Sequence, residues 1–458
     1  MKKLLRGGFV VTPRGSRRAD VLLDGEKIAQ VGHISPAEAK SAEVTDVSGC
    51  YLFPGFIDAH THFDLDVCNT TTADDFASGT RSAIRGGTTT IIDFACPNKG
   101  ETLAYGLDLW HKKADGKCSC DYGFHMTIDD WNEGIEGELD DMFAAGITSF
   151  KMYLTYPAMM IGDEAIFHAL REMKRLGGIV GVHCENAGMI DALIAEKKAA
   201  GALSPASHPL CRPAEAEAEA VGRLLKLARV ADVPVMIVHL STAAALREVE
   251  AARGLGQKVF VETCPHYLLL DDSRYSLPDF AGARYVCAPP LRKKLDNERL
   301  WKALADGEIQ TVSTDHCSFT LAQKDAGRGD FTKIPGGMPG VETRGTLLFT
   351  YGVAAGRITA ERMADVLAET PAKLYGLFPR KGVLQPGADA DIVVYDPRGT
   401  SCITAADQAA NVDYAPYEGT QIAGHIAEVY LRGTCVVREG KILHDRNGQY
   451  LHRGKCML

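Results

Sequence analysis

Six polar side chains share an unusual setting in this sequence, because each lies in or at the end of a short apolar segment rich in β-branched residues. They are His60, His62, Lys151, His183, His239 and Asp315. Imidazole and carboxylate groups suit Zn²⁺ and similar divalent ions. One histidine at the end of a strand is often only a packing or capping residue, but the regular placement of all six favours a metal site.

Lys151 lies in the segment "SFKMYLTY", residues 149–156, in which every other residue suits a buried strand. A charged ammonium there is costly unless it is neutralised or paired. A desolvated lysine beside metal ions has a lowered pKa and presents a neutral amine. Such an amine can take up CO2 as a carbamate, whose two oxygens can bridge two metal ions. The alternative is a lysine whose amine extends to the mouth of the barrel and binds a substrate anion, and spacing alone does not decide between them.

The segments that carry these residues are expected to be strands of one parallel sheet. Eight short apolar segments alternate with segments that can form helices, which is typical of a (β/α)8 barrel with insertions. The expected strands cover residues 55–60, 87–95, 122–128, 149–155, 178–184, 233–240, 258–264 and 309–315. The carboxyl ends of barrel strands meet at one mouth, where active sites are built. His60 and His62 are two residues apart, so both imidazoles face the same side of an extended segment.

The two ends of the chain have a different sequence pattern from its middle. Residues 1–53 and 375–458 contain short strand-like segments separated by turn residues. We therefore predict an α/β protein with a TIM-type barrel over residues 54–374 and a small β-sandwich domain formed from both termini. A helix is expected in the acidic segment "RPAEAEAEAVGRLLKLARVAD", with its glutamates on a solvated face.

Composition excludes several classes of function. The chain has 458 residues, 46% hydrophobic and 24% charged, with a formal net charge of −9. This acidic balance gives no support to binding of nucleic acid or of an anionic membrane. Neither a signal peptide nor a membrane-spanning segment is expected. Thirteen scattered cysteines, an odd number, indicate reduced thiols and a cytoplasmic protein.

Motifs along nearly the whole chain resemble those of the hydantoinase/dihydropyrimidinase family of the amidohydrolase superfamily. They are "PGFIDAHTHF", "GGTTTIIDFA", "ITSFKMYLTY", "VHCEN", "HLS", "ETCPHYLLL", "APPLR", "STDHCSF", "GMPGVETR" and "GADADIVVYDP". The resemblance implies a (β/α)8 barrel with a β-sandwich from both termini. It also implies two divalent metal ions per subunit, usually Zn²⁺ with Mn²⁺ or Co²⁺ as alternatives, a carboxylated Lys151, and a homotetramer.

The same resemblance assigns roles to individual residues. His60, His62 and Asp315 would hold one metal ion, His183 and His239 would hold the other, and carboxylated Lys151 would bridge both. A hydroxide held between the metals would attack the ring amide carbonyl. Asp315 would take its proton and deliver it to the leaving ring nitrogen. Tyr156 matches the family tyrosine that stabilises the tetrahedral oxyanion.

Two positions depart from the family pattern. Ala288 stands where "SPPLR" is common, and Gly336 stands where "PNG" is common. In the family these positions contact the substrate ring largely through main-chain groups, which both residues still possess. The departures affect the preferred ring more than the chemistry.

The loops after the first, second and fourth expected strands, residues 63–76, 94–102 and 154–162, are expected to roof the mouth. These loops carry Phe63, Leu65, Met159 and Met160, and Tyr153 lies just before the third loop. Such a pocket favours bulky apolar groups and offers no cation for a carboxylate. We therefore expect hydrolysis of 5-substituted hydantoins, and of dihydropyrimidines as a second class, to N-carbamoyl amino acids, with the family implying a D preference.

Three alternatives remain at this point. A dihydroorotase typically carries an arginine soon after the H-x-H pair, whereas Phe63 and Asp64 follow His62 here. An allantoinase is not excluded by any residue. A non-catalytic scaffold, like the neuronal homologues of the family, is disfavoured because this chain keeps all six ligands.

Overall fold

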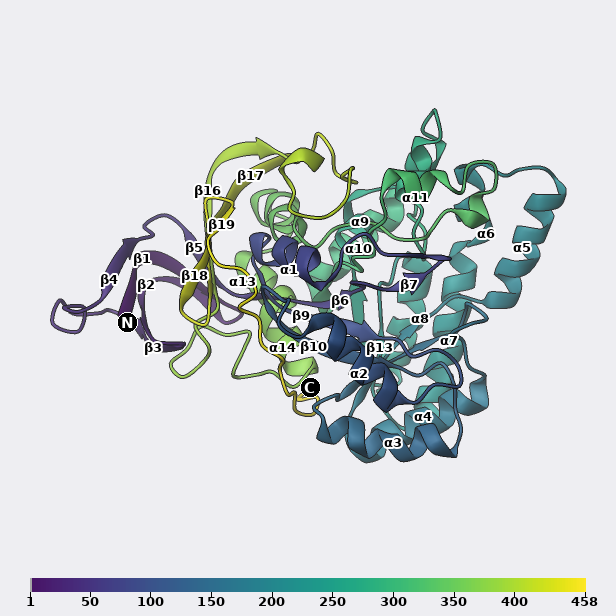
Figure 1. The fold of residues 1–458 in the computed structure, drawn as a ribbon, viewed down its shortest axis with the longest axis horizontal. Coiled ribbons are helices and arrows are strands. Elements are labelled where there is room, and N and C mark those ends of the chain that lie inside the picture. The colour runs from purple at the N-terminus through teal and green to yellow at the C-terminus, as the bar shows by residue number, and fades with distance from the viewer. Residues whose placement is uncertain (1) are drawn as a thin grey trace.

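The strands of residues 2–458, which this computed structural model describes, form two large sheets. One has eight strands from the middle of the chain, and the other has nine strands from both ends. Figure 1 shows the purple N-terminal and yellow C-terminal strands gathered at one side of the molecule, with most of the teal helices at the other. The predicted α/β architecture, with a barrel and a second β-region from both termini, is confirmed.

The eight-stranded sheet follows the order of the chain from first to last strand. Its strands are β6 (Phe56–Thr61), β9 (Thr88–Ala95), β10 (Asp121–Thr127), β11 (Ser149–Tyr153), β12 (Ile179–His183), β13 (Val235–Ile237), β14 (Val259–Thr263) and β15 (Thr311–Val312). Every neighbouring pair is parallel. Parallel barrel strands are covered on both faces, which explains why β9 is buried at all its positions.

The two edges of this sheet meet at the carboxyl end. Thr61 in β6 forms a parallel bridge with His316, which follows β15. The amide of His62 donates to the carbonyl of His316 over 2.8 Å. This contact draws the sheet into a barrel and brings the H-x-H segment beside the segment that carries Asp315.

Helices alternate with the barrel strands, as expected, and cover the outside of the barrel (Figure 1). The longer ones are α1 (Phe76–Arg85), α2 (Leu103–Ala114), α3 (Glu133–Ala144), α4 (Asp163–Leu176), α5 (Ala187–Ala199), α7 (Ala214–Ala231), α8 (Ala243–Gly254) and α10 (Lys294–Asp306). Short ones are α6 (His208–Cys211), α9 (Pro265–Leu269), α11 (Leu321–Asp325), α12 (Arg344–Leu348), α13 (Ala360–Ala364) and α14 (Thr370–Leu374). No helix within residues 2–458 combines the length and apolarity needed to cross a membrane.

The expectation that the glutamates of the acidic segment all lie on a solvated face is wrong for Glu217. Glu215 and Glu219 of α7 are exposed, whereas Glu217 is buried. Its carboxylate accepts hydrogen bonds from the guanidinium of Arg292 over 3.0 Å and from the amide of Ser241 over 2.8 Å. The sequence of the helix gave no sign of this, because both partners lie in other segments.

The second sheet combines strands from the two ends of the chain. It contains β1 (Lys2–Thr12), β2 (Gly15–Asp24), β3 (Lys27–Gly32), β4 (Glu43–Asp46), β5 (Tyr51–Pro54), β16 (Ile392–Cys402), β17 (Gln421–Leu431), β18 (Thr434–Arg438) and β19 (Lys441–Ile442). The N-terminal β5 pairs with the C-terminal β16, which joins the two halves. A separate small hairpin of β7 (Asp66–Val67) and β8 (Thr70–Thr71) lies beyond β6. The division of the chain at residues 53 and 374 stays a prediction.

A buried lysine connects the β-domain to the amino end of the barrel. The amine of Lys381 lies 2.6 Å from carboxylate oxygens of Asp121 and Asp391 and 3.0 Å from one of Asp389. Asp121 begins β10, and the other two aspartates lie just before β16. Burial opposes the charge of Lys381, but the three carboxylates raise its pKa above the usual value. In barrels of this type, residues at the amino end of the strands contribute to stability, whereas active sites lie at the opposite end, the mouth.

We predict that Lys381→Met lowers the free energy of unfolding by about 3–5 kcal/mol, because it leaves the buried carboxylate of Asp391 without a cation. Denaturant unfolding measures the change. The matched control is Lys302→Met, which removes an exposed pair with Asp306 and should cost no more than about 1 kcal/mol. Equal losses in the two variants would contradict a linking role for Lys381.

Candidate metal centre and active site

Three of the predicted ligands meet where the barrel closes. His60 lies in β6, His62 follows that strand, and Asp315 follows β15. The Nε2 atoms of His60 and His62 lie 3.2 and 3.0 Å from the same oxygen, Oδ1, of Asp315. One ligand atom from each of the three residues falls within 4.8 Å of the others. Two imidazoles and a carboxylate at this separation fit one divalent ion.

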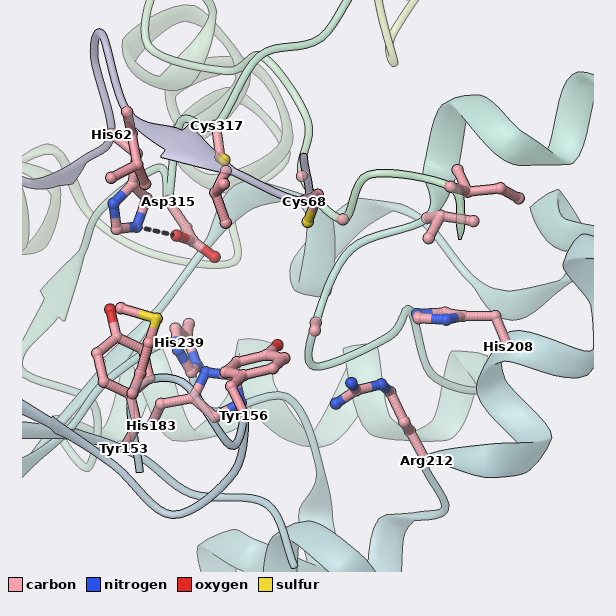
Figure 2. A pocket seen from close by; sticks show the side chains of 18 of the residues that line it. His62, Cys68, Tyr153, Tyr156, His183, His208, Arg212, His239, Asp315 and Cys317 are labelled. Carbon is pink, nitrogen blue, oxygen red and sulfur yellow. Dashed lines mark hydrogen bonds and ion pairs between the residues drawn. The ribbon is translucent and has the colours of Figure 1, made fainter. Parts of the chain in front are cut away.

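The other two predicted histidines lie next to this group. His183 ends β12, and His239 follows β13 by two residues. Their ring centroids are 4.6 Å apart, and the rings of His239 and His60 are 5.3 Å apart. Figure 2 shows His183 and His239 across the cavity from His62 and Asp315.

Lys151 lies in β11, the strand that pairs with β12, which ends at His183. Its side chain is buried, and its amine is 3.5 Å from Nε2 of His60. The amine also lies 4.9 Å from the ring centroid of Phe94 and 5.1 Å from that of Tyr153. Burial lowers the pKa of Lys151 to about 8. Within residues 2–458 the amine forms no ion pair, so a larger share of it is in the neutral form that reacts with CO2 than in an exposed lysine.

Two carboxylates that the sequence analysis did not identify stand behind the histidines. Oε1 of Glu262, in β14, lies 2.6 Å from Nδ1 of His60. Oε2 of Glu185 lies 2.8 Å from Nε2 of His183. Carboxylates in this position fix the tautomer and orientation of metal-binding imidazoles. A carboxylate in the apolar segment "KVFVETC" is as unusual as the lysine in "SFKMYLTY", so the same argument could have found Glu262.

The protonation states of His62, His239 and Asp315 suit metal binding, whereas Glu262 and Asp315 raise the pKa of His60 against the effect of burial. Burial lowers the pKa of His62 to about 4, and burial also places the pKa of His239 well below its usual value. Burial alone would raise the pKa of Asp315, but His60 and His62 hold it well below the usual range. Neutral imidazoles and an ionised carboxylate are the forms that bind metal ions.

A cavity of about 430 Å³ opens above the cluster. Among the residues predicted to contact substrate or form the pocket, six line it: Leu65, Tyr153, Tyr156, Met159, Ala288 and Gly336. Figure 2 shows the Tyr156 ring between the histidines and Arg212. Burial raises the pKa of Tyr156 above its usual value, so its hydroxyl keeps its proton and can donate a hydrogen bond.

The expected roof is only partly correct. Met160 is not among the residues that line the cavity, because the turn after Tyr156 places Met159 at the cavity and leaves Met160 36% exposed. Phe63 is fully buried against Phe76 and His316 instead. The loop at 94–102 contributes no lining residue. Residues of α5 and α6 and of the segment 331–337 take its place.

The expectation of a pocket without a cation is wrong, because Arg212 lines the cavity. Its guanidinium donates to Oε2 of Glu185 and lies 5.5 Å from the ring centroid of Tyr156. Burial opposes ionisation of Glu185, but Arg212 and His183 lower its pKa to about 2. The arginine is thus paired, through one of its nitrogens, with an ionised carboxylate that offsets its charge.

Known proteins resemble this chain over its full length. The amidohydrolase family profile matches residues 51–436. A D-hydantoinase of Streptomyces coelicolor is 44% identical over 99% of this chain and 98% of its own length. A D-phenylhydantoinase of Escherichia coli is 41% identical over 99% and 98%. The crystal structure of a dihydropyrimidinase from Brevibacillus agri has a TM-score of 0.97, at 44% identity and 99% coverage of both chains.

These likenesses confirm the resemblance indicated by the motifs, since they extend over the barrel, the β-domain and the cavity alike. By sequence and by fold, this chain belongs to the amidohydrolase family and within it to the group of hydantoinases and dihydropyrimidinases.

Proposed function

We propose that this chain is a metal-dependent cyclic amidase that hydrolyses the ring amide of 5-substituted hydantoins, and of dihydropyrimidines, to N-carbamoyl products. The observation that carries the proposal is the convergence of four histidines, an aspartate and a buried lysine on the floor of one cavity. The similarity to D-hydantoinases along the whole chain supports the reaction class.

The donor set fits a pair of divalent ions. We assign His60, His62 and Asp315 to one ion, His183 and His239 to the other, and the carbamate of Lys151 to both. Imidazole and carboxylate donors favour Zn²⁺, with Mn²⁺ and Co²⁺ as alternatives. Bound there, the ions would lower the pKa of a water molecule and polarise the ring carbonyl.

Asp315 and Tyr156 then have distinct tasks. The low pKa of Asp315 leaves a carboxylate that can accept a proton from the attacking water and return it to the ring nitrogen as the carbon–nitrogen bond breaks. Tyr156 keeps its proton and lines the cavity, so its hydroxyl can donate to the oxyanion of the tetrahedral intermediate.

The walls of the cavity indicate the substrate. Ala288 and Gly336 offer main-chain groups to the ring. Leu65, Tyr153 and Met159 offer an apolar surface to its substituent, while Arg212 is already paired with Glu185. This arrangement favours apolar 5-substituents over the carboxylate of dihydroorotate. The D preference rests on the relatives named D-hydantoinase and D-phenylhydantoinase.

Two further properties are proposed, the cellular compartment and the oligomeric state. All thirteen cysteines are free, which agrees with a reducing compartment, and we propose the cytoplasm. The homotetramer implied by the family remains a proposal that a mass measurement in solution decides.

Lys151→Ala should remove most of the bound metal. Mutation of a group that only hydrogen-bonds to a metal ligand typically lowers activity by roughly 10- to 100-fold, and loss of a bridging ligand should lower the rate by more than that. Short carboxylic acids with added metal should restore part of the activity, because they replace the carbamate oxygens. Metal analysis and kinetics measure both effects. Lys174→Ala, on the exposed face of α4, is the control. Full metal content in Lys151→Ala would refute the bridging role.

Asp315→Asn should lower kcat by at least about 100-fold, since an amide cannot accept the proton of the attacking water. Steady-state kinetics on the metal-loaded enzyme measures the loss. Asp325→Asn changes an exposed aspartate and should leave kcat unchanged. An unaltered kcat in Asp315→Asn would sink the assignment of the proton acceptor.

The substrate class is tested with a panel of purified D- and L-5-phenylhydantoin, 5-alkylhydantoins, hydantoin, dihydrouracil, dihydroorotate and allantoin. We expect the highest kcat/KM for D-5-phenyl- or D-5-alkylhydantoins, because each buried methylene contributes about 0.8 kcal/mol. Preference for allantoin or dihydroorotate would replace the proposed substrate with one of these. Absence of turnover, together with absence of metal, would favour a non-catalytic scaffold.

A further inference from the structure

A second buried lysine lies beside the cavity and takes no part in the metal cluster. Lys324, in α11, is 1% exposed. Its amine donates to three main-chain carbonyls: Val286 over 2.9 Å, Pro335 over 2.7 Å and Gly337 over 2.7 Å. These contacts use all three donors of an ammonium group. Within residues 2–458 the amine has no carboxylate partner.

The three carbonyls belong to the two segments that carry Ala288 and Gly336. Pro335 and Gly337 flank Gly336 on either side, and Val286 precedes Ala288 by two residues. The amide of Gly337 also donates to the carbonyl of Val286 over 2.9 Å. The amine therefore ties together two walls of the cavity that are about fifty residues apart in the chain.

The same contacts fix the orientation of the peptide groups at Gly336. The carbonyl and amide of a trans peptide point in opposite directions. Because the Pro335 carbonyl points at Lys324, the amide of Gly336 points away from it. An added Cβ at Gly336 would meet no atom within 4 Å, whereas one at Gly337 would lie 2.4 Å from the carbonyl oxygen of Cys317. The main chain is thus accessible at Gly336 and tightly packed next to it.

The surroundings of Lys324 show what its charge costs. The titratable groups that face it are the thiols of Cys287, Cys317 and Cys68, and its amine is 5.5 Å from the ring centroid of Phe319. Burial lowers the pKa of Lys324 to about 8. Burial of an ammonium group costs free energy, and neutral donors could satisfy the same carbonyls without that cost. Closure of a loop alone therefore does not account for a lysine at this position.

We propose that Lys324 is a positioning residue that sets the affinity for the substrate ring, by holding the main-chain groups of Ala288 and Gly336 in their binding arrangement. The proposal rests on the proposed function, since it assumes a ring held by these groups. A positioning role of this kind acts on the ring in the ground state and the transition state alike, so it should appear in KM more than in kcat.

Lys324→Met tests the proposal, because methionine fills similar space without donors or charge. We expect KM for the best hydantoin to rise about tenfold, with kcat changed by less than about threefold. Metal content should equal that of the wild type, since Lys324 makes no contact with the predicted ligands. Lys294→Met, at an exposed position at the start of α10 and away from the cavity lining, is the matched control and should leave KM unchanged.

Amide hydrogen exchange separates positioning from general damage. Peptides covering residues 284–291 and 331–340 should exchange faster in Lys324→Met, while those of the metal-bearing strands should not. If Lys324→Met does not fold, Lys324→Gln, which keeps two donors, should show smaller changes of the same kind. Faster exchange with an unchanged KM would overturn the proposal and leave Lys324 as a loop support only.

The proposed function and the proposed role of Lys324 are contradicted by different results. A wild-type enzyme that turns over no ring of the panel overturns the proposed function and the claim about ring affinity with it. An active wild type whose KM is unchanged in Lys324→Met overturns the role of Lys324 alone. A fall in kcat and metal content without a rise in KM would also overturn it, because that result assigns Lys324 to the metal centre.

Discussion

Burial of the Lys151 amine beside four histidines is the constraint on which the rest of the site depends. An isolated ammonium in this place would be destabilising, and burial already lowers its pKa to about 8. Conversion of the amine to a carbamate would replace a repelled cation with an anion that metal ions stabilise. His62 and His239 are held in the complementary state, since burial lowers the pKa of each and keeps both rings neutral.

Three buried lysines of this chain have three different environments, and each environment indicates a different task. Lys381 contacts three carboxylates that raise its pKa, which suits a permanent cation linking the β-domain to the barrel. Lys324 contacts three neutral carbonyls and orders two segments of the cavity wall. Lys151 has no ion-pair partner among the described residues and faces the histidines. Burial alone therefore does not define the role of a lysine, because its partners decide whether the charge is kept.

These environments also follow the polarity of the barrel. Lys381 lies at the amino end of the strands, where Asp121 begins β10, and its ion pairs stabilise the fold. The predicted ligands lie in or just beyond strands at the carboxyl end, where loops surround a cavity. Glu262 and Glu185 also lie toward the carboxyl end, where each places a carboxylate behind a histidine of the cavity floor.

The sequence by itself determined the barrel, its eight strands and the cluster of six polar residues, because each signal is local: an apolar segment with one polar residue near its end. The family resemblance added the pairing of ligands with metals, which stays a proposal. Only the tertiary structure placed Met159 rather than Met160 at the cavity, paired Arg212 with Glu185, and buried Glu217 against Arg292. It also brought Lys324 to carbonyls of two separate segments. These contacts join distant parts of the chain, so no pattern within one segment encodes them.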